Sequence, residues 1–119
     1  MASERRDNLE RPGMISRQWR GLARFEQASA YEEHLRAETF PALRSIEGFV
    51  DAAILRRRVP NGIEFLIVTR WESMAAIEKF AGADVEAAVV PDNVRKMMLE
   101  YDQIVFAKRP VKGAAHART

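Results

Sequence analysis

The chain has 119 residues with a formal net charge of +2; 47% of the residues are hydrophobic, 30% are charged, and none is cysteine. This length predicts one domain with a modest core, the lack of cysteine excludes disulfides and thiolate sites, and no stretch approaches the ~18 consecutive apolar residues of a membrane-spanning helix. Residues 14–107 hold 12 basic and 14 acidic residues, so the positive charge belongs to the C-terminal end and no nucleic-acid partner is expected.

The two ends of the chain differ from its middle. Residues 1–13 carry charges of both signs and no apolar stretch, which predicts a flexible N-terminal tail and no secretory signal. Residues 109–119 are small, basic and aperiodic, which predicts a flexible basic C-terminal tail. We therefore expect one folded domain over 14–108 and a cytoplasmic location.

The first half of this domain predicts a strand followed by a helix. Residues 14–25 alternate between apolar and polar side chains, which is typical of a strand. Residues 26–48 change to helical spacing. Pro41 should kink or split that helix near Thr39, and Gly48 should end it.

The second half predicts a hairpin, two helices and a final strand. Asn61-Gly62 separates two strand-like runs, 49–59 and 63–71, and this pair is a strong hairpin signal. Ser73 is a suitable N-cap for a helix that ends at Gly82. A short helix over roughly 84–98 and a fourth strand over 101–108 complete the expected elements.

This order, βαββαβ, is the α+β ferredoxin-like plan, with a four-stranded antiparallel sheet and both helices on one face. The third strand is apolar on both faces, because Phe65 and Ile67 alternate with Leu66 and Val68. The face without helices therefore needs a cover, and a second copy of the sheet is the simplest one. We expect a homodimer formed through the open sheet face.

Two stretches carry a family resemblance: YEEHLRAETFPALRSIEGF (31–49) and EFLIVTRWESMAAIEKFAG (64–82). With the hairpin between them, they resemble the antibiotic biosynthesis monooxygenase (ABM) family of dimeric α/β-barrel proteins, over roughly residues 14–108. The resemblance implies a homodimer whose sheets face each other, with a pocket between helices and sheet in each subunit. It also implies a range of activities, including cofactor-free oxygenation of polycyclic aromatic phenols and haem degradation.

The sequence departs from the family pattern at several functional positions. Phe80 and Val90 stand where the haem-degrading branch has a tryptophan and a histidine ligand. Ile67 stands where the aromatic oxygenases have an asparagine, and Phe106-Ala107 where many relatives have a His-Tyr pair. Trp71, at the end of the third predicted strand, is the position that matches the family pattern. It either lines the pocket, where it could stack on a planar ligand and donate its indole N–H, or it is a core side chain that caps the sheet.

The remaining candidate site residues lie on the first strand and the first helix. Tyr31, His34 and Glu38 share one helical stripe, so His34 is a candidate base tuned by Glu38 if this stripe faces a pocket, and a surface histidine if it does not. Arg17 and Trp19 share a strand face. Arg17 could stabilise an anionic intermediate or form a rim salt bridge, and Trp19 and Tyr31 could contact an aromatic substrate.

The sequence predicts neither a metal site nor a bound cofactor. The folded region has one histidine with no second ligand at metal-binding spacing, and no glycine-rich phosphate loop. Two functions stay open: a cofactor-independent monooxygenase of an aromatic or quinone-like molecule, and a non-catalytic protein that binds a small hydrophobic ligand.

Overall fold

The computed structural model describes residues 14–108, apart from the side chain of Phe106, so the two predicted tails lie outside the described residues. This part of the chain forms an antiparallel sheet of five strand segments: β1 (Ile15–Ala23), β2 (Phe49–Val59), β3 (Gly62–Trp71), β4 (Met98–Tyr101) and β5 (Phe106–Lys108). The strand order is β2-β3-β1-β4, and β5 pairs with the other end of β1.

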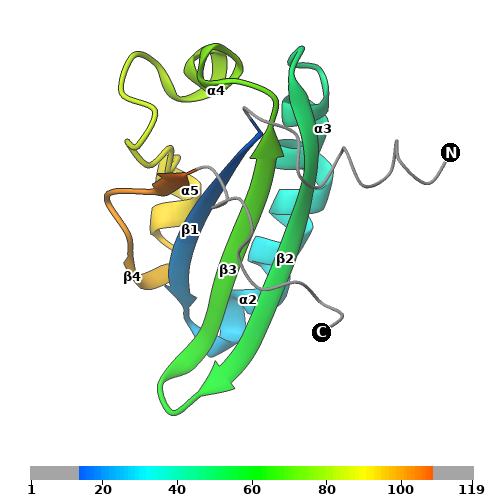
Figure 1. Ribbon diagram of the computed structural model, residues 1–119. Helices are drawn as coiled ribbons and strands as arrows, with labels where there is room; N and C mark the ends of the chain where they lie inside the picture. Colours follow the sequence, from blue (N-terminus) through cyan, green and yellow to red (C-terminus); the bar gives the residue numbers. More distant parts are fainter. Residues whose placement is uncertain (1–13, 109–119) are drawn as a thin grey trace, which may run out of the picture.

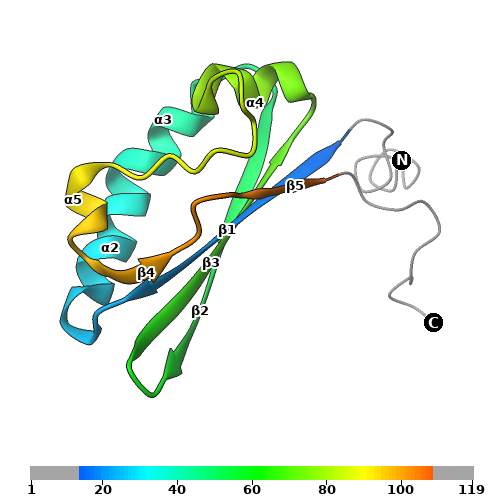
Figure 2. The same ribbon diagram turned by 90° about the vertical axis from the view of Figure 1, so that its left-hand side faces the viewer.

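The helices cover one face of this sheet and leave the other face open (Figures 1 and 2). The predicted α+β, ferredoxin-like arrangement is confirmed. Burial along β3 alternates residue by residue, and Phe65 and Trp71 are fully buried on the helix side. On the open side Leu66 is half-buried, and its β2 neighbour Leu55 is 52% exposed, so an apolar surface remains there.

The first helical region contains a π turn. It starts with a short turn, η1 (Phe25–Gln27), and continues through α2 (Ala28–His34) and the π turn η2 (Leu35–Thr39) into α3 (Phe40–Arg44). The N–H of Phe40 donates to the carbonyl of Leu35, five residues earlier. Pro41 follows and has no N–H with which to continue an α-helical ladder. The predicted interruption near Thr39 is therefore confirmed, and it takes the form of a π turn.

The β2–β3 hairpin is also confirmed, with the turn one residue earlier than predicted. Val59 pairs with Gly62, so Pro60 and Asn61 are the two turn residues and Gly62 already belongs to β3. A Cβ on Gly62 would lie 2.4 Å from the carbonyl oxygen of Ala23. Glycine is needed here because β1 passes close by, and not because of a left-handed backbone.

Helix α4 (Met74–Ala81) begins and ends as predicted. The Ser73 hydroxyl accepts the N–H of Ala76 at 3.1 Å, and Gly82 follows the helix with a φ of 88°.

The expected helix over 84–98 is wrong. Only α5 (Asp92–Arg95) is helical there, and residues 83–91 form a loop. The loop backbone bonds to the segment after β4 instead: the N–H of Ala88 donates to the Gln103 carbonyl, and the N–H of Val105 donates to the Glu86 carbonyl. Pro91 adds to this preference because it disfavours a helical residue before it.

The same contacts correct the expected strand over 101–108. Residues 103–105 turn to the loop, with a bridge between Ala87 and Ile104, and this divides the predicted strand into β4 and β5. A tertiary pairing between two segments far apart in sequence overrides the local strand pattern.

Candidate active site

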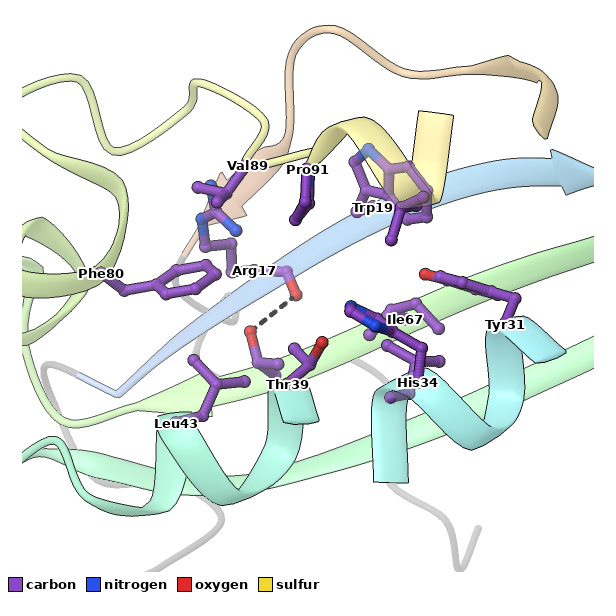
Figure 3. A pocket seen from close by; sticks show the side chains of 13 residues that line it. Arg17, Trp19, Tyr31, His34, Thr39, Leu43, Ile67, Phe80, Val89 and Pro91 are labelled. Atoms are coloured by element: carbon purple, nitrogen blue, oxygen red, sulfur yellow. Dashed lines mark hydrogen bonds between the residues drawn. The ribbon is translucent and has the colours of Figure 1, made fainter. Parts of the chain in front are cut away.

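A partly open cavity of about 70 Å³ lies between the sheet and the first helical region, and Val89 and Pro91 of the 83–91 loop contribute to its lining (Figure 3). Four of the five predicted site residues line it together: Arg17, Trp19, Tyr31 and His34. Its remaining wall is largely apolar. The arrangement therefore brings two aromatic rings, an imidazole and a guanidinium to one solvent-reachable space.

Helix α2 presents Tyr31 and His34 to the cavity. Figure 3 shows both side chains pointing inward from the same helix. Tyr31 is 3% exposed, and its ring meets Phe65 edge-on with 4.9 Å between centroids. Burial raises the pKa of Tyr31 well above its ordinary value of 10.0, so the phenol stays a neutral hydrogen-bond donor. Within the described residues neither polar group has a hydrogen-bond partner in the protein.

His34 is half-buried and is not a fully solvated surface histidine. The expected tuning by Glu38 is not seen: Glu38 is exposed, and no hydrogen bond or ion pair joins the two among the described residues. Glu38 lies inside the π turn that begins directly after His34, so the α-helical spacing assumed for this pair does not apply. The neighbouring Glu32–Arg36 pair, by contrast, forms on the surface at 2.9 Å.

Arg17 is the charged group of the cavity. It is 6% exposed; its Nε donates to the Val85 carbonyl at 3.1 Å and its Nη2 to the Ala87 carbonyl at 2.5 Å. Its guanidinium carbon lies 5.4 Å from the centroid of the Phe80 ring. Burial lowers the pKa of Arg17 below its ordinary value, to about 10, which still leaves the group charged at neutral pH.

Trp19 forms the opposite wall. Its indole N–H donates to the Asp102 carbonyl at 2.9 Å, so the ring face, and not the N–H, is available to a ligand. The ring lies 6.1 Å from that of Tyr31 and 6.2 Å from that of Tyr101. A Cβ on Gly21 would come within 2.5 Å of the Trp19 ring, so a glycine two residues further along β1 makes room for it.

Trp71 does not line this cavity, contrary to the pocket role that the family resemblance implies. It is fully buried in a core cluster with Ile15, Leu43 and Ile77, and its ring lies 5.3 Å from that of Phe49. The physical reason is its place at the last position of β3, where α4 packs over the sheet end. The core alternative is the one that the structure supports.

Several lining residues were not expected from the sequence: Thr39, Leu43, Thr69, Phe80, Val89 and Pro91. Thr69 could have been found, because it shares the helix-side face of β3 with Ile67 at a spacing of two. Thr39 could also have been found, because it lies four residues after Leu35 and eight after Tyr31 on the predicted helix. Val89 and Pro91 reach the cavity through a loop that the sequence pattern presents as a helix.

The described residues contain no group of three or more histidine, cysteine, aspartate or glutamate side chains placed to hold a metal ion. None of the helices described between residues 14 and 108 is both long enough and apolar enough to cross a membrane.

The sequence model of the antibiotic biosynthesis monooxygenase family matches residues 14–90, which is more than half of the chain. The chain belongs to the ABM family. Among proteins of curated function, none matches the sequence.

Solved structures share the ABM fold at low identity. Rv0793 from Mycobacterium tuberculosis is similar with a TM-score of 0.61 and 18% identity, covering 87% of this chain and 100% of Rv0793. A single-site variant of SnoaB, a cofactor-independent oxygenase from Streptomyces nogalater, is similar with a TM-score of 0.57 and 16% identity, covering 84% of this chain and 97% of SnoaB. At these identities the likeness shows the fold alone.

Proposed function

We propose that this ABM protein is a cofactor-independent monooxygenase that acts on an aromatic or quinone-like small molecule. The observation that supports the proposal most is that aromatic, polar and positively charged side chains line the same cavity. The Trp19 ring supplies an apolar wall, Tyr31 and His34 present polar groups without protein partners among the described residues, and Arg17 supplies a buried positive charge.

In this proposal His34 removes the proton. An imidazole is the usual general base near neutral pH, and His34 faces the cavity from α2. The substrate loses a proton from an acidic C–H or O–H group and becomes an electron-rich anion. The nearby charge of Arg17 favours that anion, since an opposite charge in a poorly solvated site stabilises it more than water would.

The anion then reacts with dioxygen. It passes one electron to O2, and the resulting substrate radical and superoxide combine to form a carbon-bound peroxide. The carbon that is oxidised begins as a CH2 group and keeps one hydrogen in the peroxide. The peroxide takes back the proton that His34 removed and loses water to leave a carbonyl, so one oxygen atom enters the product and the other leaves in water with both hydrogens of the CH2 group. In this proposal the neutral Tyr31 phenol, which lines the same cavity, donates a hydrogen bond to the oxygen that carries negative charge.

A second candidate function is binding without turnover. Ile67 lines the cavity floor at the position where the family's aromatic oxygenases carry an asparagine, so an aliphatic side chain replaces a polar one next to the ligand. A small hydrophobic ligand held by shape alone would suit such a floor.

We also propose that the protein works as a homodimer through the open sheet face. The exposed apolar side chains there, Val50 and Leu55, are 38% and 52% exposed, and Leu66 and Val68 continue the surface along β3. A second copy would cover these side chains.

Oxygen uptake with anthrone as the substrate tests the activity. The protein should consume oxygen above the background of uncatalysed oxidation and release anthraquinone. His34→Ala should lower kcat by about 10²- to 10³-fold, the range expected for loss of a general base. Glu33→Ala is the matched control, because Glu33 is adjacent, exposed and outside the cavity.

The outcomes separate the two candidates. Turnover that does not change in His34→Ala removes His34 from the mechanism. An absence of turnover together with saturable quenching of tryptophan fluorescence by anthraquinone would favour the binding protein.

A further inference from the structure

Arg17 is a buried cation without a counter-ion in the part of the chain that the structure describes. No carboxylate of the described residues pairs with it, although eight other ion pairs are formed in the same part of the chain. Both of its hydrogen-bond acceptors, the carbonyls of Val85 and Ala87, are neutral. A guanidinium that is 6% exposed would ordinarily be paired, because burying a charge without a partner is costly.

One nitrogen of this guanidinium is left without a hydrogen bond to the described residues. Nε and Nη2 bond to the loop, while Nη1 has no partner in the protein among the described residues. No fully buried side-chain nitrogen or oxygen in the described residues lacks a hydrogen bond, so Nη1 is not fully enclosed, and Arg17 is one of the residues that line the cavity. The loop bonds fix the guanidinium in place, which prepares it to receive an acceptor from a ligand.

The cavity has two chemically different ends. Figure 3 shows Arg17 with Phe80 and Val89 at one end, and Tyr31 with Trp19 at the other. The first end offers positive charge and an aromatic ring, while the second offers a neutral phenol, with His34 beside it on α2. An extended planar molecule with an anionic group on one side would contact both ends: the anionic group would meet Arg17, and the ring system would meet Trp19 and Tyr31.

We propose that the cavity binds an aromatic ligand that carries a carboxylate, and that this carboxylate pairs with Arg17 at the Phe80 end. The ring system then extends toward Trp19, which places its opposite edge near Tyr31 and His34. The assignment of that opposite edge as the reacting one rests on the proposed function. The carboxylate site itself does not, because it concerns binding. Carboxylate is the anion of choice here because a guanidinium N–H donates well to its oxygens in a charge-assisted hydrogen bond.

The test compares two oxidised ligands that cannot turn over: 9,10-anthraquinone-2-carboxylate and 9,10-anthraquinone-2-carboxamide. Their affinities are measured by titration calorimetry at pH 7 for the wild type, Arg17→Met, Arg17→Lys and Arg36→Met. Arg36 is exposed, lies outside the cavity and controls for the loss of one positive charge. Because both ligands have the same ring system, the ratio of the two affinities isolates the carboxylate.

The wild type and Arg36→Met should prefer the carboxylate by about 10- to 100-fold, as expected for a hydrogen bond between charged groups. Arg17→Met should abolish the preference, and Arg17→Lys should retain part of it. Equal affinity for both ligands in the wild type would overturn the carboxylate site. It would not contradict the proposed oxygenase function, which does not depend on this site. Loss of both affinities by the same factor in Arg17→Met would also overturn it, since Arg17 would then act only by holding the 83–91 loop. Binding of neither ligand by the wild type would overturn it as well.

Discussion

The indole N–H of Trp71 donates to the Thr69 hydroxyl at 2.8 Å, two residues earlier on the same strand face. The Thr69 hydroxyl in turn donates to the backbone carbonyl of Arg17 at 3.3 Å, across the β1–β3 pair (Figure 3). This chain of hydrogen bonds joins a core tryptophan to the strand that carries the charged group of the cavity. Trp71 therefore lies behind the cavity wall and is not among the residues that line the cavity.

Trp71→Phe should lower the free energy of unfolding by about 1–3 kcal/mol, because a buried hydroxyl loses its donor and the core loses volume. Urea denaturation measures this loss. The double variant Trp71→Phe/Thr69→Val should cost less than the sum of the single variants, because both remove the same bond. A large loss of ligand affinity with unchanged stability would show instead that Trp71 contacts the ligand.

Gly48→Ala should destabilise the protein more than Gly82→Ala. Both glycines have positive φ, 99° and 88°, so each substitution should cost about 1–3 kcal/mol in backbone strain. At Gly48 a Cβ would also lie 2.5 Å from the Cβ of Ala76, whereas nothing lies within 4 Å at Gly82. Thermal unfolding of both variants makes the comparison, and equal losses would mean that α4 yields to the added methyl group.

Glu32 should contribute stability that is lost in acid. Hydrogen bonds from Arg36 and then Arg56 lower the pKa of Glu32 below its ordinary value of 4.5. A carboxylate whose pKa is lowered on folding stabilises the fold fully above its unfolded pKa and loses that contribution as the pH falls through its folded pKa. The contribution should stay below about 1 kcal/mol because the arginine partners are exposed.

Urea melts at pH 7 and pH 3 check this expectation. Glu32→Gln should lose less stability between the two pH values than the wild type does. Glu78→Gln is the matched control, because Glu78 is exposed on α4 and makes no ion pair among the described residues. A loss as large in Glu32→Gln as in the wild type would remove Glu32 from the acid response.

Leu55→Glu should convert the proposed dimer into a monomer. Leu55 lies opposite Leu66 in the middle of the open sheet face, where a buried carboxylate without a partner would be costly. Sedimentation at micromolar concentration should give a dimer for the wild type and for Val89→Glu, which places the same charge on the helix side. A monomeric wild type would contradict the dimer.

Local patterns in the sequence were sufficient for most of the fold. Alternation in 63–71, the hairpin pair Asn61-Gly62 and the N-cap Ser73 each depend on neighbouring residues, so they could be predicted without knowledge of distant contacts. The loop over 83–91 could not, because its backbone hydrogen bonds go to residues 103–105 and tertiary pairing outweighs local helical spacing.

The sequence by itself determined the order of strands and helices, the apolar open face and the positions of the aromatic and basic side chains. Only the tertiary structure decided which of them share a cavity. Glu38 lies in a π turn and does not bond to His34, and the end of β3 buries Trp71 beneath α4. The loop carbonyls hold Arg17 at a position where no carboxylate of residues 14–108 pairs with it. Periodicity is a property of neighbours along the chain, whereas a site depends on which side chains from distant elements are left without partners when those elements pack.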